Sequence, residues 1–205
     1  MKLWTIQNEE VYKKFKSTGI LRADRNFIYD DMIFHYNWMV DQMKKRIGIP
    51  ISETIKYPIW AWYQWHGTKN KRPDLRFSGH LERGIKGVLL ELEVEAEKVL
   101  LSDFADFNNV LNYGYISNNE KEYDNFYNEL ESYGYCHYDL QSADKKSEIL
   151  EQFKIKLYES WDKIFNLERE VDERWSGKKE DQSIQATMWE VEWKQVVSGK
   201  HFIVK

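Results

Sequence analysis

Runs of apolar residues, alternating or continuous, predict short strands at both ends and in the middle of the chain. The segment Ile59–Trp65 has bulky side chains on both faces, which is typical of a central strand. In the segment 88–94, valines and leucines alternate with glutamates, as in an antiparallel strand with one exposed face. Further short strands are expected at 3–6, 99–101, 185–191 and 201–204, the last two joined by a turn around Gly199.

Apolar residues at helical spacing predict helices between these strands. Asn8 is expected to cap the first helix and Gly19 to end it. A second helix is expected at 30–47, and the pattern from about 120 to 176 is helical and highly charged. Because there is no regular β-α-β alternation, we expect one α+β domain spanning 1–205. It would hold a small, twisted, mainly antiparallel sheet with flanking helices and a helical segment in its C-terminal half.

The composition restricts partners and compartment. The chain of 205 residues has a formal net charge of −4, which gives no global attraction to nucleic acid or to anionic membranes. Nucleic acid would bind only through a local patch. Cys136 is the only cysteine, so an internal disulfide and a cysteine-based zinc site are excluded. No stretch resembles a signal peptide or approaches the ~18 apolar residues of a membrane span. We expect a cytoplasmic protein that does not enter membranes.

The most unusual feature is the aromatic segment around Ala61. Strand alternation predicts one face with Trp60, Trp62, Gln64 and His66 and an opposite face with Ile59, Ala61, Tyr63 and Trp65. The small Ala61 between large rings leaves room for a partner side chain or for a flat ligand, and stacking on tryptophan contributes about 1–3 kcal/mol. A buried strand packed by helices on both sides accounts for the same residues, because core strands also need bulk.

The loop after this strand, Lys69–Arg76, concentrates four cations against one acid, Asp74. Arg72 and Arg76 are candidates to hold a phosphate next to the tryptophans. The alternatives are a solvated surface and an ordinary turn in which Asp74 pairs with Arg72 or Arg76.

No strong catalytic signature is present. The chain lacks the phosphate-binding, dinucleotide-binding, serine hydrolase and zinc protease motifs. Its five histidines are scattered without metal-ligand spacing, so no metal site is expected. Ser102 and Asp103 precede a predicted helix and invite a nucleophile or base, but helix capping explains both with less assumption.

Several segments resemble recurring segments of the bacterial domain-of-unknown-function family 3841: 3–7, 58–62, 73–76, 100–104 and 184–189. The likeness extends over almost the whole chain. It implies a bacterial or phage source and brings no established activity.

Both ends of the chain also resemble ADP-ribosyltransferase-like folds that act on nucleic acid. The likeness rests on the opening strand with its helix ending at Gly19 and on the two closing strands. By position, Thr5 stands where that fold has a substrate-binding histidine or arginine, and Thr187 stands near the place of its catalytic glutamate. Glu190 is the neighbouring carboxylate. The resemblance therefore implies a conserved fold whose chemistry is lost or altered.

These observations predict a protein that binds a nucleotide-like ligand (NAD, a nucleotide or a nucleic-acid end) in a cleft of the sheet. The expected ligand-binding residues are Thr5, Gln7, Trp60, Trp62, His66, Arg72, Arg76, Gln185 and Thr187. If the protein is an enzyme, we expect an NAD-dependent transferase. The alternative is a non-catalytic interaction domain whose tryptophan-rich helical segment docks a protein partner or a second copy.

Overall fold

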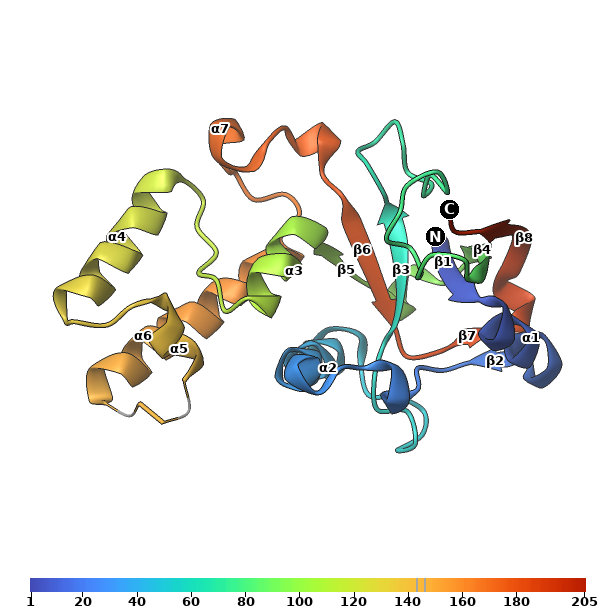
Figure 1. Cartoon of the computed structure of the whole chain (residues 1–205), viewed down its shortest axis with the longest axis horizontal. Coiled ribbons are helices and arrows are strands. Elements are labelled where there is room, and N and C mark those ends of the chain that lie inside the picture. The colour runs from blue at the N-terminus through green and yellow to red at the C-terminus, as the bar shows by residue number, and fades with distance from the viewer. Residues whose placement is uncertain (143, 146) are drawn as a thin grey trace. The chain divides into compact units, whose positions relative to one another are not determined.

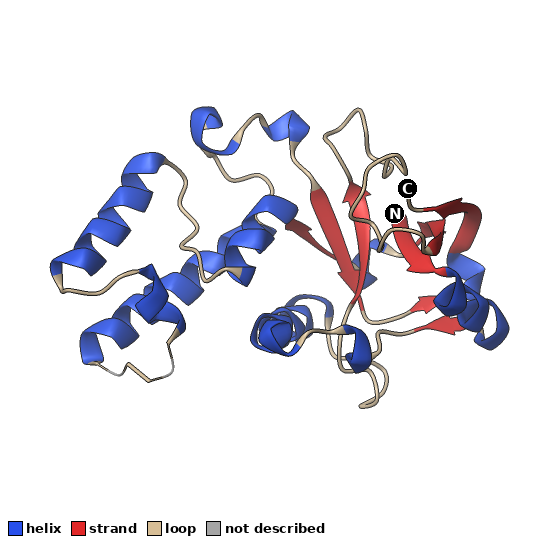
Figure 2. Ribbon diagram, in the orientation of Figure 1, coloured by secondary structure: helices blue, strands red, loops and turns tan. Residues whose placement is uncertain are grey.

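The structure is a computed structural model of the chain and describes residues 1–142, 144–145 and 147–205. The chain folds into two compact units. The sheet unit comprises Met1–Leu101 and Ser183–Lys205, and the helical unit comprises Ser102–Gln182. Figure 2 shows helices without strands from α3 to α7. The single domain expected from the sequence stays a prediction.

A six-stranded sheet dominates the sheet unit. Its strands, in spatial order, are β5 (Leu100–Asp103), β6 (Ile184–Met188), β3 (Ile59–Gln64), β1 (Lys2–Asn8), β4 (Lys86–Glu93) and β8 (Val196–Ile203). Strands β1 and β3, β1 and β4, β3 and β6, and β4 and β8 pair in antiparallel fashion. A second sheet pairs β2 (Ile20–Leu21) with β7 (Val191–Glu192). The expected α+β class with a mainly antiparallel sheet is confirmed.

Two helices belong to the sheet unit, α1 (Glu9–Thr18) and α2 (Ile33–Ile47). The Asn8 side chain accepts a hydrogen bond from the Val11 amide at 2.8 Å, and Gly19 ends α1 with a left-handed φ of 78°. Both predicted caps of this helix are confirmed. The second helix begins later than predicted, because residues 30–32 form a 3₁₀ turn. Further 3₁₀ turns lie at Arg25–Phe27, Ala96–Lys98 and Trp193–Gln195.

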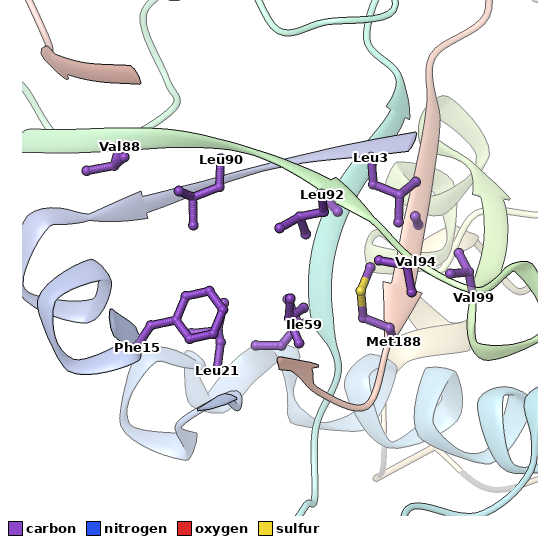
Figure 3. Close-up of a cluster of buried hydrophobic side chains, with 13 residues drawn as sticks. Leu3, Phe15, Leu21, Ile59, Val88, Leu90, Leu92, Val94, Val99 and Met188 are labelled. Atoms are coloured by element: carbon purple, nitrogen blue, oxygen red, sulfur yellow. The ribbon is translucent and has the colours of Figure 1, made fainter. Parts of the chain in front are cut away.

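One face of the sheet forms the hydrophobic core of this unit. Figure 3 shows Leu90 and Leu92 pointing from β4 to the side of the sheet on which Phe15 and Leu21 lie, and Leu3 of β1 belongs to the same buried cluster. Each leucine is fully buried, and burial of one such side chain contributes about 1.5–3 kcal/mol. The predicted core face of β4 is therefore confirmed. The opposite face is less exposed than predicted, because Leu89 is buried and Glu91 is half-buried there. Ile59 of β3 belongs to the same cluster, so the face of β3 that carries Ile59 also lies against this core.

Two predictions about strands are wrong. Gly199 lies inside β8, opposite Leu90, instead of in a turn. A Cβ atom added there would lie 3.2 Å from Leu90 Cδ2, so the glycine allows close packing against β4. The strand β3 ends at Gln64, and a bulge between Trp62 and Gln64 interrupts its alternation. Trp65 therefore lies beside Trp62, with ring centroids 4.5 Å apart, rather than on the opposite face.

The helical unit contains α3 (Phe104–Leu111), α4 (Glu120–Ser132), α5 (His137–Gln141), α6 (Glu148–Trp161) and α7 (Glu173–Ser176), with 3₁₀ turns at Asp162–Phe165 and Lys179–Asp181. Figure 1 shows α4, α5 and α6 as successive helices joined by loops. Trp161 is fully buried, and its indole Nε1 donates to the Gly114 carbonyl oxygen at 2.9 Å. The helical segment predicted at about 120–176 is thus present, although Ala143 and Lys146 lie outside the described residues. Of the helices described, none is long and apolar enough to cross a membrane.

Candidate functional site: an aromatic and cationic cleft beside β3

A cleft of about 660 Å³ opens at the loop that follows β3, within the range typical of small-molecule sites. It is lined by Trp65, His66, Asn70, Arg72, Pro73, Asp74, Leu75, Arg76, Phe77 and Lys200. Three of the residues predicted to bind a ligand lie here: His66, Arg72 and Arg76. All lining residues belong to the sheet unit.

Main-chain hydrogen bonds shape the first half of this loop. The Trp65 amide donates to the Lys71 carbonyl oxygen at 2.9 Å, and the His66 amide donates to the Asn70 carbonyl oxygen at 3.0 Å. Gly67 allows the reversal between them with a φ of 75°, which residues with a Cβ rarely adopt. This small hairpin holds Trp65 and His66 at the edge of the cleft.

Asp74 organises the second half of the loop. Its carboxylate accepts hydrogen bonds from the Arg76 amide and from Arg76 Nε, both at 3.0 Å. Its carbonyl oxygen accepts from the Phe77 amide at 3.1 Å and lies 2.9 Å from His80 Nε2. The loop therefore forms the ordinary turn that the sequence left as an alternative, with Asp74 paired to Arg76. These bonds place Phe77 on the cleft wall.

The rings of the cleft form a connected group. The centroids of Trp65 and His66 are 5.1 Å apart, and those of His66 and Phe77 are 5.6 Å apart. Phe77 is 53% exposed, so one large ring is open to a ligand. An exposed phenylalanine held in place by its neighbours is a surface on which a planar group can stack.

The cations of the cleft differ in how they are neutralised. Hydrogen bonds from Arg76 lower the pKa of Asp74 to about 2 and raise the pKa of Arg76, so this pair stays ionised. In the part of the chain that the structure describes, no acid forms an ion pair with Arg72 or Lys200. An ion pair with Lys2 lowers the pKa of Glu91, and the charge of Arg72 adds to that effect. The cleft therefore keeps an excess of positive charge.

The predicted polar residues of the neighbouring strands lie elsewhere. Thr5 is 1% exposed and its Oγ1 donates to the Trp60 carbonyl oxygen at 2.9 Å, while Gln7 Nε2 donates to Thr5 Oγ1 at 2.9 Å. Thr187 is fully buried, and its Oγ1 donates to the Leu100 carbonyl oxygen at 3.3 Å. These hydroxyls hold strands together and do not line the cleft.

Three further predicted residues also lie outside the lining of the cleft. Trp60 is half-buried and packs against Tyr36 of α2, with ring centroids 5.8 Å apart. Trp62 lies opposite Gln185 in the strand register and stacks edge-on against Trp65. The aromatic wall of the cleft is therefore built by Trp65 and not by the two tryptophans that were predicted.

A second polar group lies in the helical unit. Asp103 caps α3, since its carboxylate accepts from the Asp106 amide at 2.9 Å, as the sequence predicted. Burial raises the pKa of Asp103 and of Asp106, although the Arg169 guanidinium, which pairs with Asp106, opposes the rise. Ser102 is fully buried in this region. Across the described residues, no group of three or more histidines, cysteines and carboxylates is placed to hold a metal.

Comparison with known proteins gives one family. The family model described as "Domain of unknown function (DUF3841)" matches residues 2–197. No curated protein and no solved structure matches the chain.

Proposed function

The chain belongs to this family, whose description assigns no activity, and we propose that it binds a small phosphorylated molecule with a planar ring, such as a nucleotide or NAD. The observation that supports this function best is one cleft in which the exposed Phe77 and His66 lie together with Arg72 and Lys200. Neither part is sufficient alone, since exposed rings and exposed cations are common on protein surfaces.

The two kinds of side chain suit the two parts of such a ligand. A base or nicotinamide that stacks on an aromatic ring gains about 1–3 kcal/mol. The planar guanidinium of Arg72 can donate two parallel hydrogen bonds to a phosphate, and the Lys200 ammonium supplies a second positive charge. A cleft of about 660 Å³ has room for both parts.

A small ligand suits this chain better than a nucleic acid. The net charge of −4 opposes long polyanions, whose binding depends on many phosphate contacts. Only two cations of the cleft lack an ion-pair partner among the described residues, which matches one or two phosphates. Nucleic acid would be held at most by one end.

Transfer of ADP-ribose from NAD is a further step, which the sequence resemblance suggests. Thr5 and Thr187 stand at or near the positions of the functional residues of ADP-ribosyltransferase-like folds. Both are buried, and their hydroxyls donate to main-chain oxygens. The carboxylate inside the cleft, Asp74, is neutralised by Arg76. We therefore favour binding without transfer.

Titration with ADP, NAD and ADP-ribose tests the proposal. A bound ligand at 100 times its dissociation constant raises the free energy of unfolding by about 2.7 kcal/mol, which a thermal shift detects. Arg72→Ala is expected to weaken binding about tenfold or more, since a hydrogen bond to a charged group contributes about 1.5–3 kcal/mol. Phe77→Ala is expected to weaken it by a similar factor through lost stacking.

The matched control is Arg83→Ala, which removes an exposed cation outside the cleft lining. It should leave every dissociation constant unchanged. The proposal is wrong if none of the three ligands shifts the unfolding transition, or if Arg83→Ala weakens binding as much as Arg72→Ala.

A further inference from the structure

The helical unit carries the negative charge of the protein. Residues 102–182 contain 19 aspartates and glutamates against 10 lysines and arginines. The sheet unit has the opposite balance, with 15 acidic and 20 basic residues. A surface that repels anions attracts cationic partners, so the helical unit selects a different kind of ligand from the cleft.

A row of rings crosses this acidic unit, which we call the aromatic strip: Tyr123, Tyr127, His137, Tyr138 and Trp175. Its neighbouring centroids lie 5.2 Å apart for Tyr123 and Trp175, 4.5 Å for Tyr123 and Tyr127, and 5.8 Å for Tyr127 and His137. His137 and Tyr138 continue the row at 5.8 Å. The strip is open, with Trp175 40% and Tyr138 76% exposed.

Carboxylates accompany the strip along α4. Glu120, Asp124 and Glu131 stand three or four residues from Tyr123 or Tyr127, which places acids and rings on adjoining parts of one helix surface. All three are exposed, and no cation among the described residues pairs with them.

The acids continue at the Trp175 end of the strip. Asp172 precedes Trp175 by three residues and is exposed, and the Trp175 amide donates to its carbonyl oxygen at 2.9 Å. A hollow of about 630 Å³ lies at the start of α4, lined by Asn118, Asn119, Glu120, Lys121, Glu170, Val171 and Asp172. The Asp172 amide donates to the Asn118 carbonyl oxygen at 3.0 Å, which holds the Trp175 segment against the start of α4. Lys121 and Arg174 are the cations in these segments, and the acids outnumber them.

We propose that the aromatic strip is a docking surface for an arginine-rich segment of a protein partner. A guanidinium lying over an exposed tyrosine or tryptophan ring gains about 0.5–1 kcal/mol and can at the same time donate to a neighbouring carboxylate. The strip repeats this combination of ring and acid along α4 and again at Trp175 and Asp172. Charge complementarity therefore selects a cationic partner, and the rings select arginine over lysine.

The test uses the full-length chain with fluorescein-labelled oligo-arginine and oligo-lysine peptides of equal length, followed by fluorescence anisotropy. Oligo-arginine should bind more tightly than oligo-lysine. Trp175→Ala and Glu131→Gln should each weaken oligo-arginine binding about threefold or more. Circular dichroism must show that the variants keep their helices.

Glu159→Gln is the matched control, because Glu159 is an exposed carboxylate of α6, a helix that contributes no residue to the aromatic strip. An equal loss in Glu159→Gln and Glu131→Gln would overturn the proposal, because diffuse charge would then explain the binding. Equal affinity for the two peptides, or no binding at all, would also overturn it.

Analytical sedimentation of the chain without peptide tests whether a second copy of the chain covers the strip instead. If the chain forms a salt-sensitive dimer that Trp175→Ala dissociates, a second copy covers the strip and the proposal is wrong. These measurements are independent of the nucleotide titration, since the strip and the cleft share no residue.

Discussion

An aromatic and a cationic residue of the sheet unit, Phe77 and Arg72, contrast with Trp161 and Arg169 of the helical unit. In the sheet unit, Phe77 stays open and Arg72 has no ion-pair partner among the described residues, so both are available to a ligand. In the helical unit, Trp161 is fully buried and Arg169 pairs with Asp106. The same residue types can therefore lie open at the surface or be enclosed in a core, and only the surroundings of each ring distinguish the two.

The largest effect on stability is expected when a tryptophan ring is removed from each unit, Trp161 from the helical unit and Trp65 from the sheet unit. Trp161→Ala is expected to lower the free energy of unfolding by about 3–5 kcal/mol, because it opens a cavity and removes the donor to Gly114. Trp65→Ala should cost less than about 2 kcal/mol, because Trp65 is only half-buried. Equilibrium denaturation in urea measures both values. Equal losses would contradict the contrast between the units.

The partly buried ion pair of the helical unit gives the next prediction. Arg169→Met leaves the Asp106 carboxylate without its cation and should cost roughly 3 kcal/mol near pH 7. Burial already raises the pKa of Asp106, and loss of Arg169 raises it further. The folded state then binds a proton more readily than the unfolded state, so the deficit should shrink as pH falls from about 7 toward 4. Denaturation curves at several pH values measure this trend, and a deficit that grows with acid would contradict it.

A packing test in the sheet unit should have a smaller effect. A Cβ atom at Gly87 would lie 2.7 Å from Leu81 Cδ1 and from Phe202 Cζ. Gly87→Ala is therefore expected to lower the free energy of unfolding by about 1–3 kcal/mol through overpacking. Thermal denaturation is the measurement. Gly134 cannot serve as the control position, because its φ of 79° would add backbone strain to any alanine there. An unchanged melting temperature in Gly87→Ala would contradict the prediction.

The affinity of the cleft for phosphate can be raised by removing its one carboxylate. Asp74→Asn removes the partner of Arg76 and frees a third cation for phosphate, so ADP should bind several-fold more tightly. In the unchanged protein the pKa of Asp74 is about 2, so this residue causes no change in affinity at any pH above about 4. Calorimetric titration of both forms is the check. Weaker binding by Asp74→Asn would mean that the turn itself is needed.

The smallest predicted effect concerns His35, which is 2% exposed in α2. Burial lowers the pKa of His35 below 6.5, while the charge of Asp31 opposes the shift. The unfolded chain therefore takes up the proton first, and stability should fall as pH decreases through about 6.5. His35→Met should flatten this part of the stability profile, measured by denaturation between about pH 7 and 5. An unchanged slope would show that other groups cause it.

Features determined by neighbours in the sequence were predictable. Asn8 and Gly19 were recognised as caps, and Asp103 as one of two candidates with Ser102, because a cap depends on a residue type at one position of a local turn. The core face of β4 was readable for the same reason, since its burial places apolar residues at every second position, Val88, Leu90 and Leu92.

Features that depend on distant pairing were not predictable. Lys200 reaches the cleft because β8 pairs with β4, and Gly199 lies in a strand for the same reason. Trp65 does not lie on its expected face because of a bulge between Trp62 and Gln64. The segment has no glycine there, which would have indicated a bulge. Phe77 directly follows the predicted cationic loop, and it could have been found from the sequence by extending that loop to the next aromatic residue.

The strand order has a consequence for synthesis of the protein. β6 and β8 come last in the chain, yet they cover the outer edges of β3 and β4, which are made much earlier. A growing chain on the ribosome therefore carries two open strand edges while the whole of residues 102–182 is still being translated. Such edges attract other strands, so the interval before β8 emerges is when the nascent chain is most prone to aggregate.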